Sequence, residues 1–365
     1  MKKRLLSAVL ALAMALTMLP LSVFASPRPT DPGVSVTYHA TEKANAVYQG
    51  GFSTAGYFSG RGTQTDPYVA ATGTVLIGSK MYNSMSEAIS WGSSFKLVGD
   101  DSSTITTDKT SITIDVNDHA FNGNITMSKG GTLNITDSQY KGTRKQGAGA
   151  ISFSAGTTAL SGTVTLTNVS VTSVSIATGG TGRVTLNNAA TTGGVTLNGQ
   201  AGYTNSSNTA VATNAAQTLA VNNTSTIGGN VSVKGKGSKV TLSTGTIAGT
   251  LTVEGAQTEV NASNRSELTG NVTLTASSAD ADKSANAPKL VLDNSTITGT
   301  LTIDKGTQTR ASDVTLSNNG RILGTTTLDN AAVKMTSSHM SDLTLKKGSL
   351  TVGDKVNDGS TLGAV

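Results

Sequence analysis

Hydrophobic residues recur along most of the chain in a rhythm that includes a glycine. In one unit the successive intervals are five, two, two and two residues, as in Leu242, Ile247, Gly249, Leu251 and Val253. The same order returns after Val116, Leu186 and Leu292, and it returns with a first interval of six after Val221 and Leu316. A short unit repeated in this way predicts an array of one supersecondary element.

Polar and apolar side chains alternate inside each unit, as in residues 250–254 and 300–304. A period of two places one face of a strand inward and the other in water, and helical spacing is absent. The interior position before each glycine, or its equivalent, falls at residues 121, 140, 171, 191, 227, 247, 268, 297, 322 and 340. Several of these steps are near twenty residues, the length of one coil of a β-solenoid. We therefore expect an all-β protein whose residues 97–365 form a single-stranded right-handed parallel β-helix of ten coils.

A polar residue follows the first apolar run of each unit. Asn and Asp tolerate left-handed backbone and hydrogen-bond their own turn. They predict a ladder along one corner of the stack, formed by Asp118, Asp137, Asn168, Asn188, Asn223, Thr244, Asn294, Asn318 and Asn330.

The first residues have the composition of an export signal. Three basic residues precede an apolar segment over residues 5–19, and a Val-Phe-Ala sequence ends at residue 25. Residues 1–25 are predicted to be a cleaved signal peptide; a retained membrane anchor is disfavoured because the apolar segment is short. The proline-rich residues 26–33 are expected to form an extended linker. We expect a secreted or cell-surface protein without an integral membrane segment after cleavage.

Charge and cysteine content exclude several partners. The formal net charge is +5, three of these charges lie in residues 2–4, and the remaining +2 is too small to favour nucleic acid. The chain contains no cysteine, so it has no disulfide and no thiolate metal site. No cofactor is expected.

Residues 34–96 differ from the rest because they are rich in aromatic residues. One interpretation is a sugar-stacking platform, with candidate binding residues Tyr38, Tyr48, Tyr57, Phe58 and Tyr68. The favoured interpretation is the small core of an amino-terminal element, since clustered aromatic side chains are commonly buried.

A short capping helix is predicted over residues 84–91. Ser84 and Glu87 have the spacing of a capping box, and Gly92 follows. We expect Met85, Ile89 and Trp91 to pack onto the first coil of the solenoid.

Several segments resemble a known family. Residues 60–68 (Gly-Arg-Gly-Thr-Gln-Thr-Asp-Pro-Tyr) resemble the entry segment of secreted bacterial β-helix proteins. Residues 82–89, 95–98, 111–123 and 131–138 resemble the start of pectin-lyase-like β-helices in large adhesin-like surface proteins of Gram-positive bacteria, with departures at Asp118 and Phe121. The resemblance covers about residues 60–140. It implies a stalk or adhesive surface, although polysaccharide lyases and hydrolases share the fold.

Two acidic groups are candidates for chemistry. Asp118 and Asp137 occupy the same predicted turn position, and Lys141, Arg144 and Lys145 follow in a loop. They predict either an acid/base or Ca²⁺ site or, as we favour, two members of the turn ladder. Another candidate, the spacing of Asp280, Asp282 and Ser284, fits half of a calcium loop but lacks its central glycine and closing glutamate, so a polar loop is favoured. The isolated His39, His119 and His339 show no metal spacing.

Outward positions of the second strand carry hydroxyl groups in Thr126, Thr196, Ser232, Thr252, Thr273, Thr302 and Thr327. An ice-binding face is one interpretation; the favoured one is an ordinary wetted strand face, because threonine has a high β propensity.

The alternation continues through residues 343–352, so we expect the β-helix to continue beyond the chain end or to be covered by a partner, including end-to-end self-association. The sequence thus favours a non-catalytic extracellular structural or adhesive module that presents a polar face to glycans or to host or extracellular-matrix proteins. The alternative is a pectin-lyase-type polysaccharide lyase or glycoside hydrolase.

Overall fold

The computed structural model describes residues 73–154, 156–276, 286–353 and 359–364. Before residue 73 it describes only the backbone of four short strands, β1 (Val34–Ser35), β2 (Tyr48–Gln49), β3 (Tyr57–Ser59) and β4 (Tyr68–Ala70).

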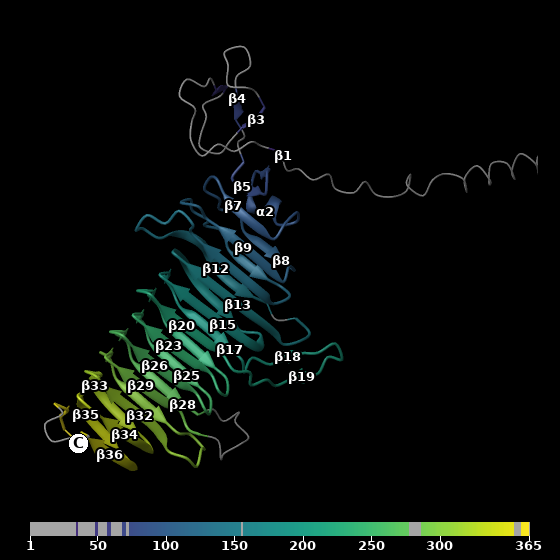
Figure 1. The fold of residues 1–365 in the computed structure, drawn as a ribbon. Helices are drawn as coiled ribbons and strands as arrows, with labels where there is room; N and C mark the ends of the chain where they lie inside the picture. Colours follow the sequence, from purple (N-terminus) through teal and green to yellow (C-terminus); the bar gives the residue numbers. More distant parts are fainter. Residues whose placement is uncertain are drawn as a thin grey trace, which may run out of the picture. The chain divides into compact units, whose positions relative to one another are not determined.

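Parallel coils are stacked along the described part of the chain (Figure 1). Each coil contributes one strand to a long ladder whose pairs are all parallel from β7 onward. These twelve strands are β7 (Ser94–Leu97), β9 (Ser111–Asp115), β11 (Gly131–Thr136), β13 (Leu160–Thr167), β15 (Gly179–Asn187), β20 (Thr218–Asn222), β23 (Lys239–Ser243), β26 (Glu259–Ser263), β29 (Lys289–Asp293), β32 (Ser312–Ser317), β34 (Ala331–Met335) and β36 (Gly348–Val352). The β-solenoid is confirmed, and its twelve coils exceed the ten predicted because the first and the last coil lack the full repeat.

The returning half of each coil forms the opposite side. In seven coils it is one strand: β8 (Ile105–Thr107), β10 (Ile125–Met127), β12 (Lys145–Phe153), β14 (Val169–Ile176), β33 (Arg321–Leu328), β35 (His339–Leu345) and β37 (Thr361–Leu362). In five coils a corner divides it into β16 (Ala190–Thr191) and β17 (Val195–Asn198), β21 (Thr226–Ile227) and β22 (Val231–Lys234), β24 (Thr246–Ile247) and β25 (Leu251–Glu254), β27 (Glu267–Leu268) and β28 (Val272–Thr275), and β30 (Thr296–Ile297) and β31 (Leu301–Asp304).

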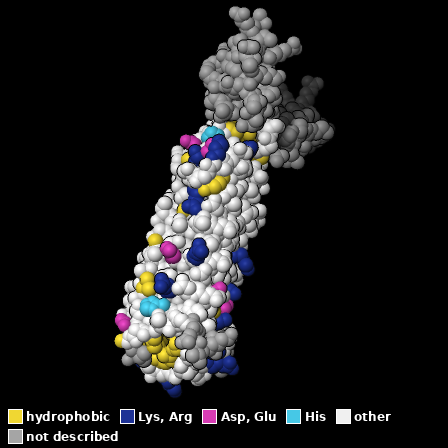
Figure 2. All heavy atoms as spheres, turned by 60° about the vertical axis from the view of Figure 1, so that its left-hand side comes forward, with side chains coloured by type: hydrophobic (Ala, Val, Ile, Leu, Met, Phe, Trp, Pro, Cys, Tyr) yellow, Lys and Arg dark blue, Asp and Glu magenta, His cyan; other side chains and the backbone are white. Residues whose placement is uncertain are grey.

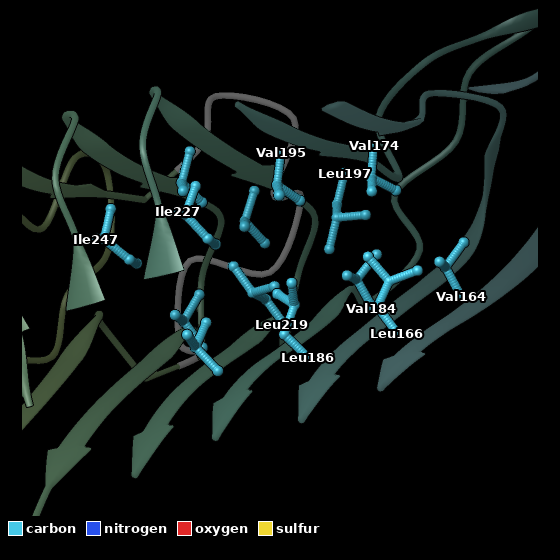
Figure 3. Packing of buried hydrophobic residues seen from close by; sticks show 14 of the residues in the cluster. Val164, Leu166, Val174, Val184, Leu186, Val195, Leu197, Leu219, Ile227 and Ile247 are labelled. Atoms are coloured by element: carbon cyan, nitrogen blue, oxygen red, sulfur yellow. The ribbon is translucent and has the colours of Figure 1, made fainter. Parts of the chain in front are cut away.

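The recurring apolar side chains fill the space between the two sides. Figure 3 shows Val164, Leu166 and Leu186 from one side facing Val174 and Leu197 from the other. All five are at most 1% exposed, and they belong to one cluster that includes buried apolar residues of every coil but the last, whose Leu350 and Leu362 are partly buried and pack against it. Each such side chain contributes roughly 1.5–3 kcal/mol when buried. Stability is therefore distributed along the stack, as the alternation predicted.

The recurring glycines lie at a corner where neighbouring backbones nearly touch. A Cβ atom on Gly249 would lie 2.4 Å from backbone atoms of Gly229, and one on Gly270 would lie 2.3 Å from the carbonyl oxygen of Gly249. The corresponding closest distances at Gly299 and Gly324 are 2.5 and 2.4 Å. Carbon atoms pack at roughly 3.5–4.0 Å. The repeated glycine is therefore required by the stacking itself.

The other corner carries residues in the left-handed region. Positive φ angles of 46 to 61° occur at Asn168, Asn188, Asn223, Thr244, Asn264, Asn294, Asn318 and Ser337. This ladder corrects the predicted one: Asn264 and Ser337 belong to it, whereas Asn330 precedes β34 at a different turn, where its carbonyl accepts from Ser312 N–H.

The first interval of the repeat alternates between six and five residues because longer and shorter corners alternate. The longer corners contain an extra left-handed residue, namely Thr224, Arg265 or Asn319, with φ of 59, 63 and 69°. The N–H group of each donates to a carbonyl in the shorter corner that follows it, at 2.9, 2.6 and 2.7 Å respectively. The extra residue thus adds one hydrogen bond between each longer corner and the shorter corner that follows it.

A helix and a hairpin precede the first coil. Helix α2 (Met85–Ala88) is shorter than the predicted residues 84–91, with Ser84 as its N-cap and Ile89 as its C-cap. Its Met85 side chain is fully buried in the main cluster, and Trp91 packs against that cluster. The N–H groups of Met85 and Ser86 donate to Asp101 Oδ2 and Ser103 Oγ, at 2.9 and 3.0 Å. Strands β5 (Val75–Ile77) and β6 (Lys80–Tyr82) pair antiparallel with each other, and β5 pairs antiparallel with β7.

Long connections interrupt the regular coils, and two of them lie entirely within the described residues. The chain between β17 and β20 includes the antiparallel hairpin of β18 (Tyr203–Thr204) and β19 (Ala210–Val211), which extends from the side of the stack (Figure 1). Another connection joins β11 to β12 and contains Tyr140, so the assignment of residue 140 to an interior position is wrong. The residue in register with interior Val171 is Ala148.

Candidate functional site

The predicted acidic cluster does come together, although in a different register. Thr136 pairs with Asp115, so Asp137 aligns with Val116 and does not share the turn position of Asp118. The two residues still touch, because Asp118 N–H donates to Asp137 Oδ1 at 2.9 Å.

The carboxylate of Asp118 lies between two lysines. Its oxygens are 2.7 Å from Lys141 Nζ and 3.1 Å from Lys145 Nζ. The hydrogen bond from Lys141, followed by that from Lys145, lowers the pKa of Asp118, and the same Asp118 carboxylate raises the pKa of Lys141. A carboxyl group with a lowered pKa is a poorer acid catalyst near neutral pH, and an amine with a raised pKa is a poorer base.

Asp137 is buried beside this ion pair. Its Oδ1 accepts from the N–H groups of Asp118 and Gln139, at 2.9 and 3.0 Å. Its Oδ2 is buried without a hydrogen-bond partner. A purely structural role for the cluster does not explain this unpaired oxygen.

Arg144 is directed away from both carboxylates. Its guanidinium donates to the carbonyl and side-chain oxygens of Asn188 at 2.9 and 3.0 Å, and to the carbonyl of Thr224 at 2.9 Å. The predicted group of five is therefore divided: two lysines surround Asp118, while the arginine joins corners of later coils.

The remaining predicted site residues are placed only in part. Tyr38, Asp280, Asp282 and Ser284 lie outside the described residues. Tyr48, Tyr57, Phe58 and Tyr68 lie on β2, β3 and β4, where the backbone of Tyr48 is in register with that of Tyr68.

Within the described ranges, no three His, Asp or Glu side chains are grouped so that they could hold a metal ion. None of the helices described there is long and apolar enough to span a membrane.

His119 and His339 both lie near polar neighbours. His119 Nδ1 is 3.7 Å from Asp100 Oδ1. His339 Nδ1 and Thr361 Oγ1 share a hydrogen bond of 2.6 Å, which connects the last two coils. Both histidines thus have structural partners.

A continuous column of hydroxyl groups follows one face of the stack. Strand register adds four residues to the seven that the sequence identified, and it aligns eleven in consecutive coils: Thr106, Thr126, Ser152, Ser175, Thr196, Ser232, Thr252, Thr273, Thr302, Thr327 and Thr344. The adjacent outward column is mixed, since it contains Lys234 and Glu254, whose charged atoms are 3.0 Å apart. Figure 2 shows one face of the molecule, where charged side chains of both signs are scattered among uncharged atoms.

Charged side chains also alternate across the first side of the stack. Lys239, Glu259 and Lys289 are in register on β23, β26 and β29. Glu259 lies 3.2 Å from the first lysine and 3.0 Å from the second. Burial raises the pKa of Glu259, but hydrogen bonds from Lys289, Asn261 and Lys239 outweigh burial and leave its pKa below the usual value.

A polar hollow at the left-handed corner was not anticipated. It has a volume of about 200 Å³, and its lining includes Arg265, Glu267, Thr296 and Arg321. Sequence reasoning missed it because these residues lie on three different coils. The sequence feature that could have indicated the hollow is the alternation of the first interval of the repeat between five and six residues.

Comparison with protein-family models, with curated proteins and with solved structures finds no match to this chain.

Proposed function

We propose that this chain is a non-catalytic extracellular structural or adhesive module of a secreted or surface protein. The observation that supports it best is the unbroken column of eleven hydroxyl groups, which repeats one polar surface from coil to coil over a continuous apolar core. Glycans, or host or extracellular-matrix proteins, are the partners that such a surface suits, because both offer many hydrogen-bonding groups. Residues 1–25 direct export in this proposal.

The two ends of the stack have different roles in this proposal. The coils wind in a right-handed sense, the hand that parallel strand connections almost always adopt. Helix α2 covers the first coil, supported by the burial of Met85 and by the bonds to Asp101 and Ser103. At the other end, hydrophobic side chains gather at the surface (Figure 2), and Val352 is 44% exposed.

A pectin-lyase-type lyase or hydrolase is the alternative, and the unpartnered Oδ2 of buried Asp137 is the observation that favours it. Against an enzymatic role, the pKa of Asp118 is lowered and the pKa of Lys141 is raised. Both groups are therefore charged near neutral pH, where neither is suited to proton transfer.

One pair of measurements tests the proposal. The full chain is incubated with immobilised glycans and matrix proteins to measure retention, and with soluble polysaccharides to measure new reducing or unsaturated ends. We expect retention without cleavage. Cleavage that disappears in the double variant Asp118→Asn, Asp137→Asn would establish the enzyme instead, and absence of both retention and cleavage would reject the adhesive role.

A further inference from the structure

The corner hollow exists because a short coil lies between two longer ones. Six residues separate Ala262 from Leu268 and Leu316 from Ile322, whereas five separate Leu292 from Ile297. The two longer corners therefore extend past the shorter corner between them. We call the hollow lined by Arg265, Ser266, Glu267, Asn294, Thr296, Asn319 and Arg321 the corner notch.

Backbone bonds fix the floor of the corner notch. Ser295 is 2% exposed, and its Oγ accepts from Ser266 N–H at 3.2 Å while donating to Asp293 O at 3.0 Å. Arg265 N–H donates to the carbonyl of Asn294 at 2.6 Å. The strands that follow are in register, with Thr296 between Glu267 and Arg321. The side chains at the mouth thus extend from a corner whose backbone is held by hydrogen bonds.

The notch carries more positive than negative charge. Arg265, Arg321 and Glu267 are all exposed, which gives two cations and one anion. Among the described residues, the structure records no ion pair for either arginine. Two guanidinium groups near a hollow of this size match an oxyanion, because planar forked donors bind such groups in two-point contacts.

The other lining groups restrict what carries the oxyanion. Asn294, Asn319 and Thr296 donate and accept hydrogen bonds, and the lining contains no apolar side chain. A peptide segment would normally require apolar contacts, whereas a saccharide offers hydroxyl groups to every one of these side chains. The carboxylate of Glu267 would repel a ligand group that carries two negative charges, so a singly charged group is favoured.

We propose that the corner notch binds a singly charged sulfate ester on a saccharide. A sulfate ester presents three terminal oxygens to the donors of Arg265, Arg321 and Asn319, and its single charge matches the net charge of the notch. Ring hydroxyl groups bond to Thr296 and Glu267. This inference rests on the proposed binding function and names one ligand class for it.

Isothermal titration of the full chain with a sulfated dextran oligosaccharide tests the inference, with carboxymethylated and unsubstituted dextran as comparisons. We expect Arg265→Gln and Arg321→Gln each to weaken binding of the sulfated oligosaccharide about tenfold, which is about 1.4 kcal/mol, because each replacement removes a hydrogen bond between charged groups. Glu267→Gln should tighten binding about threefold by removing a repulsive charge. Arg183→Gln is the matched control, because it removes an exposed arginine from β15, outside the notch, and should leave affinity unchanged.

Two results overturn the inference. One is unchanged affinity in both notch arginine variants, or an equal loss in Arg183→Gln, which would mean that binding reflects net charge alone. The other is equal affinity for carboxymethylated and sulfated dextran, which would reject the sulfate assignment. If the chain is retained on glycans or matrix proteins but the notch variants bind with unchanged affinity, only the notch is rejected. If the chain is retained on neither, the proposed function fails as well.

Discussion

Replacement of Gly249 by alanine tests whether close backbone stacking at the glycine corner holds the coils together. The added Cβ atom would lie 2.4 Å from both the carbonyl carbon and the carbonyl oxygen of Gly229. Both atoms belong to the backbone, so no side chain can rotate to make room. The φ angle of Gly249 is outside the left-handed region, so alanine itself adopts this conformation without strain.

The magnitude follows from two opposing effects. Overpacking a tight site costs about 1–3 kcal/mol, whereas replacing glycine by alanine restricts the unfolded chain and returns about 0.4–1 kcal/mol. We therefore expect Gly249→Ala to lower the free energy of unfolding by about 1–2 kcal/mol. Gly156→Ala is the matched control, because a Cβ atom there has nothing within 4 Å, and it should be neutral or slightly stabilising.

Denaturant unfolding followed by far-UV circular dichroism measures the difference. Because repeat arrays do not always unfold in a single step, amide hydrogen exchange should accompany it. We expect the loss of protection to centre on the strands that flank Gly249 and Gly229. A Gly249→Ala protein as stable as the Gly156→Ala control, with unchanged exchange, would refute the close stacking of this corner.

Four further measurements address the core, the charges and the hydroxyl column. Leu274→Ala should lower the free energy of unfolding by about 2–5 kcal/mol, because this side chain is fully buried. Val352→Ala should change it by less than about 1 kcal/mol, because Val352 is exposed. Equal effects in denaturant unfolding would contradict the conclusion that the buried core ends before Val352. A carbon NMR titration should place the Asp118 midpoint below the ordinary aspartate pKa, and Lys141→Gln should raise it. Because this pKa is lowered by folding, the stability from the pair is present above the ordinary value and is lost as pH falls through the lowered one. Glu259→Lys should place three lysines in register and lower stability by about 0.5 kcal/mol, more at low salt than at high salt. The full chain should show no thermal hysteresis, since the hydroxyl column is bordered by charged side chains.

Local alternation was sufficient to predict the core, because the side-chain period of a strand does not depend on its partners. Leu251 and Val253 were assigned to the interior and are at most 1% exposed. The glycine was identified from its spacing alone, but its cause, contact with the glycine of the preceding coil, required the stacked structure.

Errors arose where a coil departs from the usual length. Tyr140 was counted as an interior residue because the long connection before β12 was not recognised, and the true equivalent is Ala148. Asn330 was included in the corner ladder on residue type, while Ser337 takes the left-handed position by backbone register. Residue type identifies a turn, but only register shows which corner the turn occupies.

The same distinction explains why the sequence predicts the members of the acidic cluster but not their contacts. Asp118, Lys141 and Lys145 were named together, yet the ion pairs depend on how the β11–β12 connection folds back over the preceding turn. Arg144 was placed with them by proximity in sequence, whereas its contacts are with Asn188 and Thr224, on later coils. Sequence distance carries little information across a stack whose neighbours lie one coil apart.

Corner length is the property through which this fold can vary its surface without changing its core. Inward positions must stay apolar and the glycine corner must stay bare, because each contacts the coil before it. The left-handed corner is less constrained, since an extra residue is accommodated when its N–H group bonds to the shorter neighbour, as at Thr224, Arg265 and Asn319. Each insertion adds side chains beside the adjacent coil, and the insertions at Arg265 and Asn319 flank the short coil at which the corner notch lies. In our proposal, the side chains of those extra residues determine what the hollow binds. Arg265 therefore contributes to recognition of the sulfate ester. Thr224 serves mainly to join neighbouring corners.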